Sequence, residues 1–148
     1  MQDQIDKLQA ALDRAPADGS TFGELVRLLT EASRWEDLLR LLESRARLLP
    51  DAPSTASLWA RAGEVLRLHL GQPVRAEECF QRALLANPDE SAALAGLGAL
   101  LEAKGDAAAL VPVLERLARS ASGGEAAALF LALGAAQEKL GRRDRAVL

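Results

Sequence analysis

The residues that most often carry chemistry are scarce in this chain. Its 148 residues include one histidine, His69, and one cysteine, Cys79. A structural zinc site takes four ligands, so these two residues alone cannot form one. A single cysteine also excludes an internal disulfide. We therefore expect Cys79 to be a small packing residue and His69 to have a surface or inter-helix role.

Enzyme motifs are absent as well. The sequence contains no G-x-S-x-G nucleophile turn, no GK[ST] phosphate loop, no HExxH and no GxGxxG. The pair Gly96-Leu-Gly98 falls inside an apolar helical pattern, so it is not a phosphate loop. The sequence therefore predicts no catalytic, cofactor-binding or metal-binding residues. We expect a protein that is not an enzyme and holds no cofactor.

Composition limits the partners and the fold class. Hydrophobic residues make up 49% of the chain but aromatic residues only 3%, and Leu and Ala dominate. This favours helices over strands. The net charge is −3 and no basic run is present, so a nucleic-acid partner is not expected. No stretch has the length for membrane insertion, and the N-terminus lacks the order of a signal peptide. We expect a cytoplasmic protein, and the Arg-rich, Ala-rich composition suggests a bacterial source.

One stretch carries a dense pattern of spaced small and large residues. It runs Trp59-Ala-Arg-Ala62-Gly63-Glu-Val-Leu66, passes Gly71, and continues as Ala76-Glu-Glu-Cys-Phe80-Gln-Arg-Ala83-Leu84 to Asn87-Pro88. The pattern resembles the tetratricopeptide repeat W-x2-L-G-x2-Y…A-x3-F…P. Ala62 and Leu66 depart from it toward smaller or aliphatic residues.

The same frame recurs before and after this stretch. The equivalent positions are Val26, Gly63, Gly98 and Gly134, spaced by 37, 35 and 36 residues. The family period is about 34 residues. The resemblance implies an all-α fold, a right-handed α-solenoid of antiparallel helical hairpins with about eight helices. It implies a single repeat domain over residues 1–148, part of a longer array. Its units would be a lone second helix at 2–16, repeats at 19–50, 56–88 and 91–122, and a truncated repeat at 127–148.

Helical periodicity and turn residues place the helices. We predict helices at about 2–14, 20–32, 35–48, 54–70, 73–86, 91–103, 107–119 and 124–140, and a ninth that begins near Arg143. Glycines mark three helix ends, and two aspartates suggest N-caps: Gly71, Gly105 and Gly141, then Asp89 and Asp106. Pro50 and Pro88 fall just past second helices. Pro112 lies inside a predicted helix, where we expect a late start or a kink.

Packing expectations follow from the repeat. A glycine inside a helix costs about 1 kcal/mol against Ala. We therefore expect Gly63, Gly98 and Gly134 to lie at close helix–helix contacts. Trp35 and Trp59 occupy positions for large packing side chains, so we expect both in the core.

The resemblance implies that the first helix of each hairpin lines a concave surface, where a protein partner binds. On the helix at 54–70 the outward positions would be Ser57, Ala60, Glu64 and Arg67. Candidate partner-binding residues on all four first helices are Arg27, Glu31, Glu64, Arg67, Ala95, Ala99, Glu102, Leu131, Ala135 and Glu138. Those in the C-terminal half would form an Ala-lined apolar trough flanked by Glu102 and Glu138. An alternative is that Ala marks nothing, since it is common on every helix.

The predicted function is a protein–protein interaction module that scaffolds a peptide or protein segment on its concave face. The expected ligand is an amphipathic segment with basic residues. A structural spacer or self-association region of a larger protein is the alternative. The last predicted first helix carries Leu129, Phe130, Leu133 and Leu140 without a full partner helix. We therefore also expect self-association through the C-terminal edge.

Overall fold

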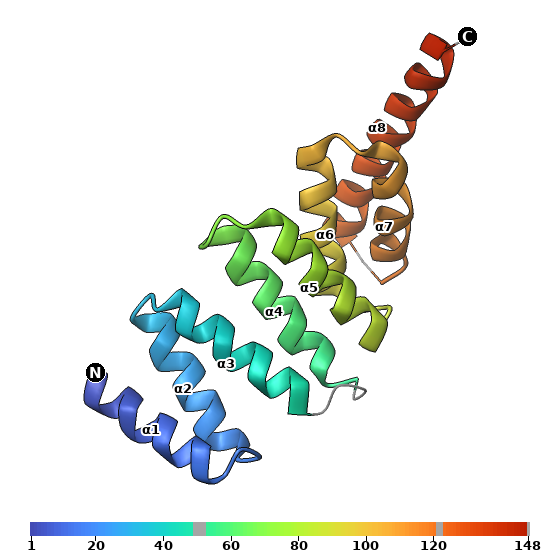
Figure 1. Ribbon diagram of the computed structural model, residues 1–148. Coiled ribbons are helices and arrows are strands. Elements are labelled where there is room, and N and C mark those ends of the chain that lie inside the picture. The colour runs from blue at the N-terminus through green and yellow to red at the C-terminus, as the bar shows by residue number, and fades with distance from the viewer. Residues whose placement is uncertain (49–52, 121–122, 148) are drawn as a thin grey trace.

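The computed structural model describes every residue except 49–52, 121–122 and 148, and no side chain from residue 142 onward. The described part is entirely α-helical and contains no strand. Its helices are α1 (Gln2–Arg14), α2 (Gly19–Glu31), α3 (Trp35–Leu48), α4 (Thr55–Leu68), α5 (Pro73–Ala86), α6 (Ser91–Lys104), α7 (Ala107–Ser120) and α8 (Gly123–Val147). They follow one another along an elongated array, with the termini at opposite ends (Figure 1).

The predicted bounds of the first seven helices agree with the structure to within two residues. The predicted ninth helix is wrong, because α8 is a single helix of 25 residues that continues past Gly141. An interior glycine weakens a helix by about 1 kcal/mol but does not by itself end one. The run that follows Gly141 contains good helix formers, so the helix continues. Pro50 lies outside the described residues.

Side-chain caps fix two helix starts. The carboxylate of Asp18 accepts hydrogen bonds from the backbone N–H groups of Ser20 and Thr21, at 3.1 and 3.4 Å, and starts α2. Asp106 accepts from the N–H of Ala109 at 3.2 Å, which confirms its predicted role at α7. The N-cap predicted at Asp89 is wrong. Glu90 precedes α6 without a side-chain cap, and the N–H of Asp89 donates to Asn87 within the preceding turn.

Left-handed residues make the turns. Gly71 and Gly105 have φ of 60° and 72°, as expected for glycines that follow a helix. Ser33, with φ of 55°, takes this conformation between α2 and α3 without being a glycine.

α7 begins at Ala107, so the late start expected from Pro112 is wrong. Pro112 is exposed, so water can satisfy the carbonyl group that its missing N–H would have bonded.

The core of the array is built around Phe80 of α5, which is fully buried. A Cβ atom built on Gly63 of α4 or on Gly96 of α6 would lie closer than 3.0 Å to the Phe80 ring. The two glycines therefore form a slot from opposite helices, and the ring fills it. This confirms the close contact predicted for Gly63. Gly96, which the sequence pattern did not single out, is the second wall of the slot.

The other predicted glycine contacts differ. A Cβ on Gly98 would meet Val113 at 3.6 Å, which is an ordinary van der Waals distance. A Cβ on Gly134 would meet nothing within 4 Å, and Gly134 is exposed. The close contact predicted at Gly134 is therefore wrong. The face of α8 that turns toward α7 instead carries Leu129, Leu133 and Ala136.

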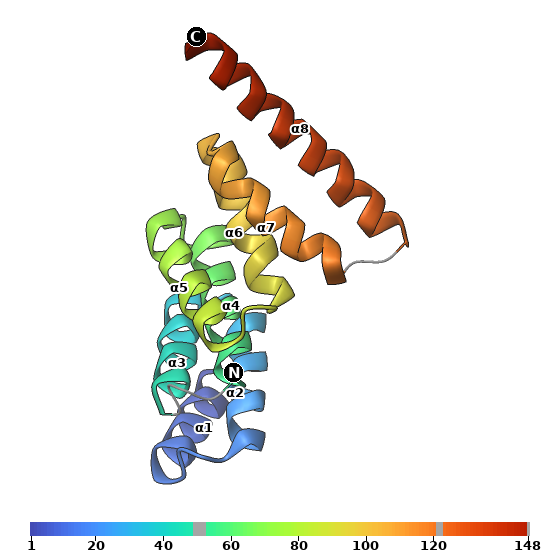
Figure 2. The same ribbon diagram turned by 90° about the vertical axis from the view of Figure 1, so that its right-hand side faces the viewer.

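Each helix packs against the next along the chain, and α4 also packs against α6. α8 contacts α7 but, among the described residues, makes no such contact with α6. Figure 2 shows α8 leaving the array at an angle beyond α7. The stack is therefore tight in its middle and open at its C-terminal end.

Candidate protein-binding surfaces

A hollow of about 320 Å³ lies between α6, α7 and α8, and we call it the α6–α8 groove. Its floor consists of three leucines of α7, and its walls are mostly alanines of α6 and α8. The lining residues are Ala95, Gly98, Ala99, Leu101, Glu102, Gly105, Ala107, Leu110, Leu114, Leu117, Leu129, Ala132, Ala135, Ala136 and Lys139. The groove is thus apolar, with one acid and one base among its lining residues.

Small side chains are the reason for the groove. α6 presents Ala95 and Ala99 one turn apart, and α8 presents Ala132, Ala135 and Ala136. These methyl groups do not span the space between α6 and α8, whose backbones do not approach each other closely among the described residues. The space over the α7 leucines therefore stays open.

The groove brings together four of the predicted partner-binding residues: Ala95, Ala99, Glu102 and Ala135. Leu131 and Glu138 do not line it. Leu131 is 77% exposed on another face of α8, and Glu138 is exposed. Lys139, which the repeat pattern did not indicate, lines the groove on the α8 side, whereas Glu102 lines it on the α6 side. The charges at the groove are therefore mixed rather than acidic.

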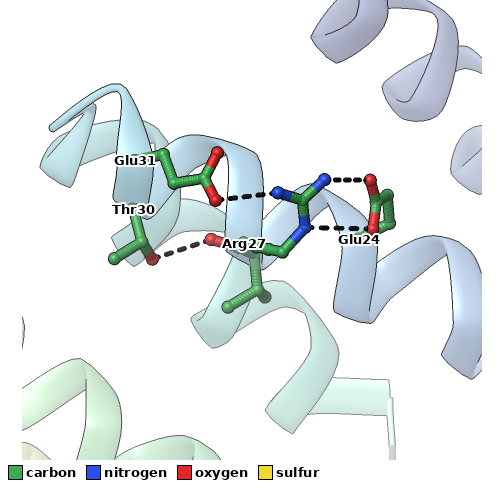
Figure 3. Close-up of polar contacts among 5 residues, drawn as sticks. Glu24, Arg27, Thr30 and Glu31 are labelled. Atoms are coloured by element: carbon green, nitrogen blue, oxygen red, sulfur yellow. Dashed lines mark hydrogen bonds and ion pairs between the residues drawn. The ribbon is translucent and has the colours of Figure 1, made fainter.

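In the N-terminal half, Arg27 is held by carboxylates of its own helix. Its guanidinium donates to Glu24 and, at 2.7 Å, to Glu31 (Figure 3). These two hydrogen bonds raise the pKa of Arg27 above its ordinary value, and the bond to Glu24 has the larger effect. The hydrogen bond from Arg27 in turn lowers the pKa of Glu24. Arg27 and Glu31 therefore offer a neutralised pair rather than a free cation and a free acid.

Arg67 and Glu64 on α4 behave in the same way. Arg67 Nη2 donates to both carboxylate oxygens of Glu64, at 3.3 and 3.1 Å. Both side chains are about a third exposed or less. Each of the four N-terminal candidates is thus paired with an oppositely charged residue of its own helix.

One further hollow, of about 360 Å³, lies between α2 and α4, and another, of about 310 Å³, lies mainly between α3 and α4. Arg61 of α4 lines both of them and is exposed. No hydrogen bond or ion pair joins Arg61 to another described residue. Ala60, predicted to face outward, is instead 1% exposed. The residues of α4 that line these hollows therefore include Arg61 and Glu64. Arg61 takes the outward position that was predicted for Ala60, one residue earlier.

An aromatic stack closes one of these hollows. The rings of Trp35 and His69 lie face to face, with centroids 3.6 Å apart and planes inclined by 7°. Trp35 is only partly buried, so its predicted place in the core is correct only in part, whereas Trp59 is buried as predicted. The stack gives His69 an inter-helix role. The two stacked residues lie 34 positions apart in the sequence, so the local pattern does not reveal that they pair.

Cys79 is buried, and burial raises the pKa of its thiol to about 11. At neutral pH this thiol stays protonated, so it is a poor nucleophile. Over the described residues, no group of three or more His, Cys, Asp or Glu side chains could hold a metal ion. The same part of the chain has no helix with the length and apolar character to cross a membrane.

Comparisons with known proteins agree with this architecture. The family model described as tetratricopeptide repeat matches residues 5–148. No sequence among curated proteins matches the chain. Two solved structures, titled crystal structures of MamA protein and of MamA, superpose with TM-scores of 0.69 and 0.71 at 19% and 20% identity. Each covers 97% of this chain, which spans 75% and 80% of theirs. At this identity the likeness shows the fold, a helical solenoid.

Proposed function

Because the chain belongs to the tetratricopeptide repeat family, we propose that it is a non-enzymatic scaffold that binds a protein segment in the α6–α8 groove. The family supports protein binding in general, and the groove supports this particular place. An apolar hollow of about 320 Å³ with small side chains on both walls lets a ligand approach the backbone of α6 and α8 closely. That hollow is the observation on which the proposal rests.

The ligand that fits is an amphipathic segment. Its apolar side chains would cover Leu110, Leu114 and Leu117, and a basic residue would pair with Glu102 on the α6 side. Lys139 on the α8 side adds a place for an acidic group, which the sequence pattern did not suggest. Affinity should fall with salt, because exposed charge pairs are screened.

The test compares two substitutions on the same helix. Peptides are selected from a displayed library on the intact protein, and their affinity is measured by calorimetry. Ala135→Glu places a charge in the groove and should weaken binding at least tenfold. Leu131→Glu places the same charge outside it and should leave affinity within twofold. Equal effects of both variants, or an effect of Leu131→Glu alone, would contradict the α6–α8 groove as the site.

Glu102→Lys tests the charge preference separately. It should weaken a selected basic peptide and strengthen an acidic one, whereas Glu138→Lys should do neither. If Glu138→Lys has the larger effect, the ligand lies along the exposed face of α8 instead.

A second candidate function, self-association through the C-terminal edge, is favoured by the exposed apolar face of α8. Phe130 and Leu131 are 59% and 77% exposed. Side chains of this size commonly become buried on association. Light scattering as a function of protein concentration tests it.

A further inference from the structure

Another hollow lies away from the surface used by the proposed function. It has a volume of about 550 Å³ and lies between α1 and α3, over α2, and we call it the α1–α3 groove. α1 and α3 make no direct backbone contact among the described residues. Its floor is apolar and includes Ile5, Leu12, Leu29 and Leu41. All four are buried, so the floor is formed by the packed core of this end.

Hydrogen bonds close the groove at both ends. At one end Arg34, the residue just before α3, donates to the side-chain oxygen of Gln2. At the other end Arg45 donates to the carbonyl oxygen of Pro16, at 2.6 Å, and its guanidinium lies over the ring of Phe22. These ties hold α1 at a fixed place beside α3. The groove is therefore a bounded trough about as long as α1, which at 13 residues is roughly 20 Å.

The two walls carry opposite charge. The α1 wall presents Asp6 and Asp13, which accept hydrogen bonds from Gln2 and Gln9, at 2.8 and 3.0 Å, and lack an ion pair among the described residues. The opposite wall, formed by α3 and the residue just before it, is called the α3 wall. It presents three arginines against one acid: Arg34, Arg40, Arg45 and Asp37. Asp37 pairs with Arg34 and Arg40 on the same wall, at 2.7 and 3.5 Å.

No ion pair crosses the groove between described residues, although the walls face each other with net charges of opposite sign. Both walls therefore keep a charge that an occupant between them could neutralise. Such an occupant needs basic groups toward α1 and acidic groups toward α3. A single chain segment with basic groups on one side and acidic groups on the other would therefore match the charges of both walls.

The opposite net charges of the two walls favour an extended segment. An extended chain points successive side chains to opposite sides. Alternating basic and acidic residues in such a chain would face α1 and α3 respectively.

We propose that the α1–α3 groove is a second docking site, which binds an extended protein segment of alternating basic and acidic residues. It lies at the opposite end of the array from the α6–α8 groove. The chain could then hold two segments at once. The site does not depend on the proposed function of the α6–α8 groove.

Four dye-labelled peptides of equal length serve as probes, and fluorescence anisotropy with the full chain measures binding. One alternates Lys and Glu, one has the same residues in two blocks, one is all Lys, and one is all Glu. The alternating peptide should bind at least tenfold tighter than the other three, and this binding should weaken with salt. Equal affinities for the alternating and block peptides, or no binding of the alternating peptide, would overturn the proposal.

Charge reversal of one wall gives a gain of function. Asp6→Lys with Asp13→Lys makes both walls basic, so the protein should lose the alternating peptide and gain the all-Glu peptide. Asp3→Lys with Asp89→Lys changes the net charge equally at exposed residues outside the groove and is the matched control. If the control shifts preference as much as the wall variant, net charge and not the groove decides, and the proposal fails. Ala135→Glu should leave this binding unchanged, which separates it from the α6–α8 groove.

Discussion

In the middle of the array, glycines inside α4 and α6 face the ring of Phe80, whereas a glycine inside α8 faces open space. The same residue type at similar positions of successive first helices thus has two structural meanings. In the middle, Gly63 and Gly96 allow two helices to approach a shared aromatic ring. In α8, Gly134 has no neighbour to make room for, and the large side chain nearby, Phe130, is itself 59% exposed. A repeated sequence position therefore predicts a packing role only where a neighbouring side chain comes close.

The largest effect should come from removing the ring. Phe80→Ala should lower the free energy of unfolding by about 3–5 kcal/mol, near the upper end, because the glycines on both sides have no side chains that could fill the cavity. Phe130→Ala should change it by about 0.5 kcal/mol or less, since that ring is exposed. Urea denaturation of the two variants measures the difference. Similar losses for both would mean that α8 packs as tightly as α5.

Much of the fold was readable from the sequence. The spacing of Trp59, Gly63 and Phe80 predicts a hairpin because Gly63 and Phe80 meet within one repeat, and Trp59 is buried in the same core. Helix ends were readable where a local signal, such as Gly105 or Asp106, acts on its own backbone. Gly96 was missed because its function depends on a ring sixteen positions earlier that reaches across from another helix.

The candidate surfaces were less readable. The burial of Ala60 and the exposure of Arg61 depend on how far α4 is rotated about its axis, which the repeat frame gives to about one residue. Gly141 resembles a helix end, but an interior glycine only weakens a helix, and α8 continues past it. The α6–α8 groove was predicted in part, because Ala95 and Ala99 share a face of one helix.

Substitution of a wall of the slot should have the next largest effect. Gly96→Ala would place a methyl group against the Phe80 ring, which cannot move away because Gly63 closes the opposite side. We expect a loss of about 1–3 kcal/mol from overpacking, less up to about 1 kcal/mol regained from helix propensity. Thermal unfolding followed by circular dichroism measures the net change. In a Phe80→Leu background the same substitution should cost less, and strict additivity of the two would argue against a shared slot.

The matching substitution in α8 should have the opposite sign. Gly134→Ala adds a methyl group where nothing lies within 4 Å. It should stabilise the protein by up to about 1 kcal/mol, because only the helix propensity changes. The measurement is the same thermal scan as for Gly96→Ala. A destabilised Gly134→Ala variant would reveal a close neighbour of α8 in solution, for which a second copy of the chain is one source.

The smallest effect on stability is expected at the exposed ring of α8. There the informative measurement is whether the protein self-associates. Phe130→Ser removes apolar surface that the monomer leaves 59% exposed, so at low protein concentration its unfolding free energy should stay within about 0.5 kcal/mol of the original. If the C-terminal edge associates, the intact protein should show a molecular mass that rises with concentration in light scattering, and Phe130→Ser should stay monomeric. Leu85→Ser is the matched control, because Leu85 is an exposed leucine on α5, far from α8 along the chain. An intact protein that remains monomeric at millimolar concentration would contradict self-association and leave the exposed face of α8 without that function.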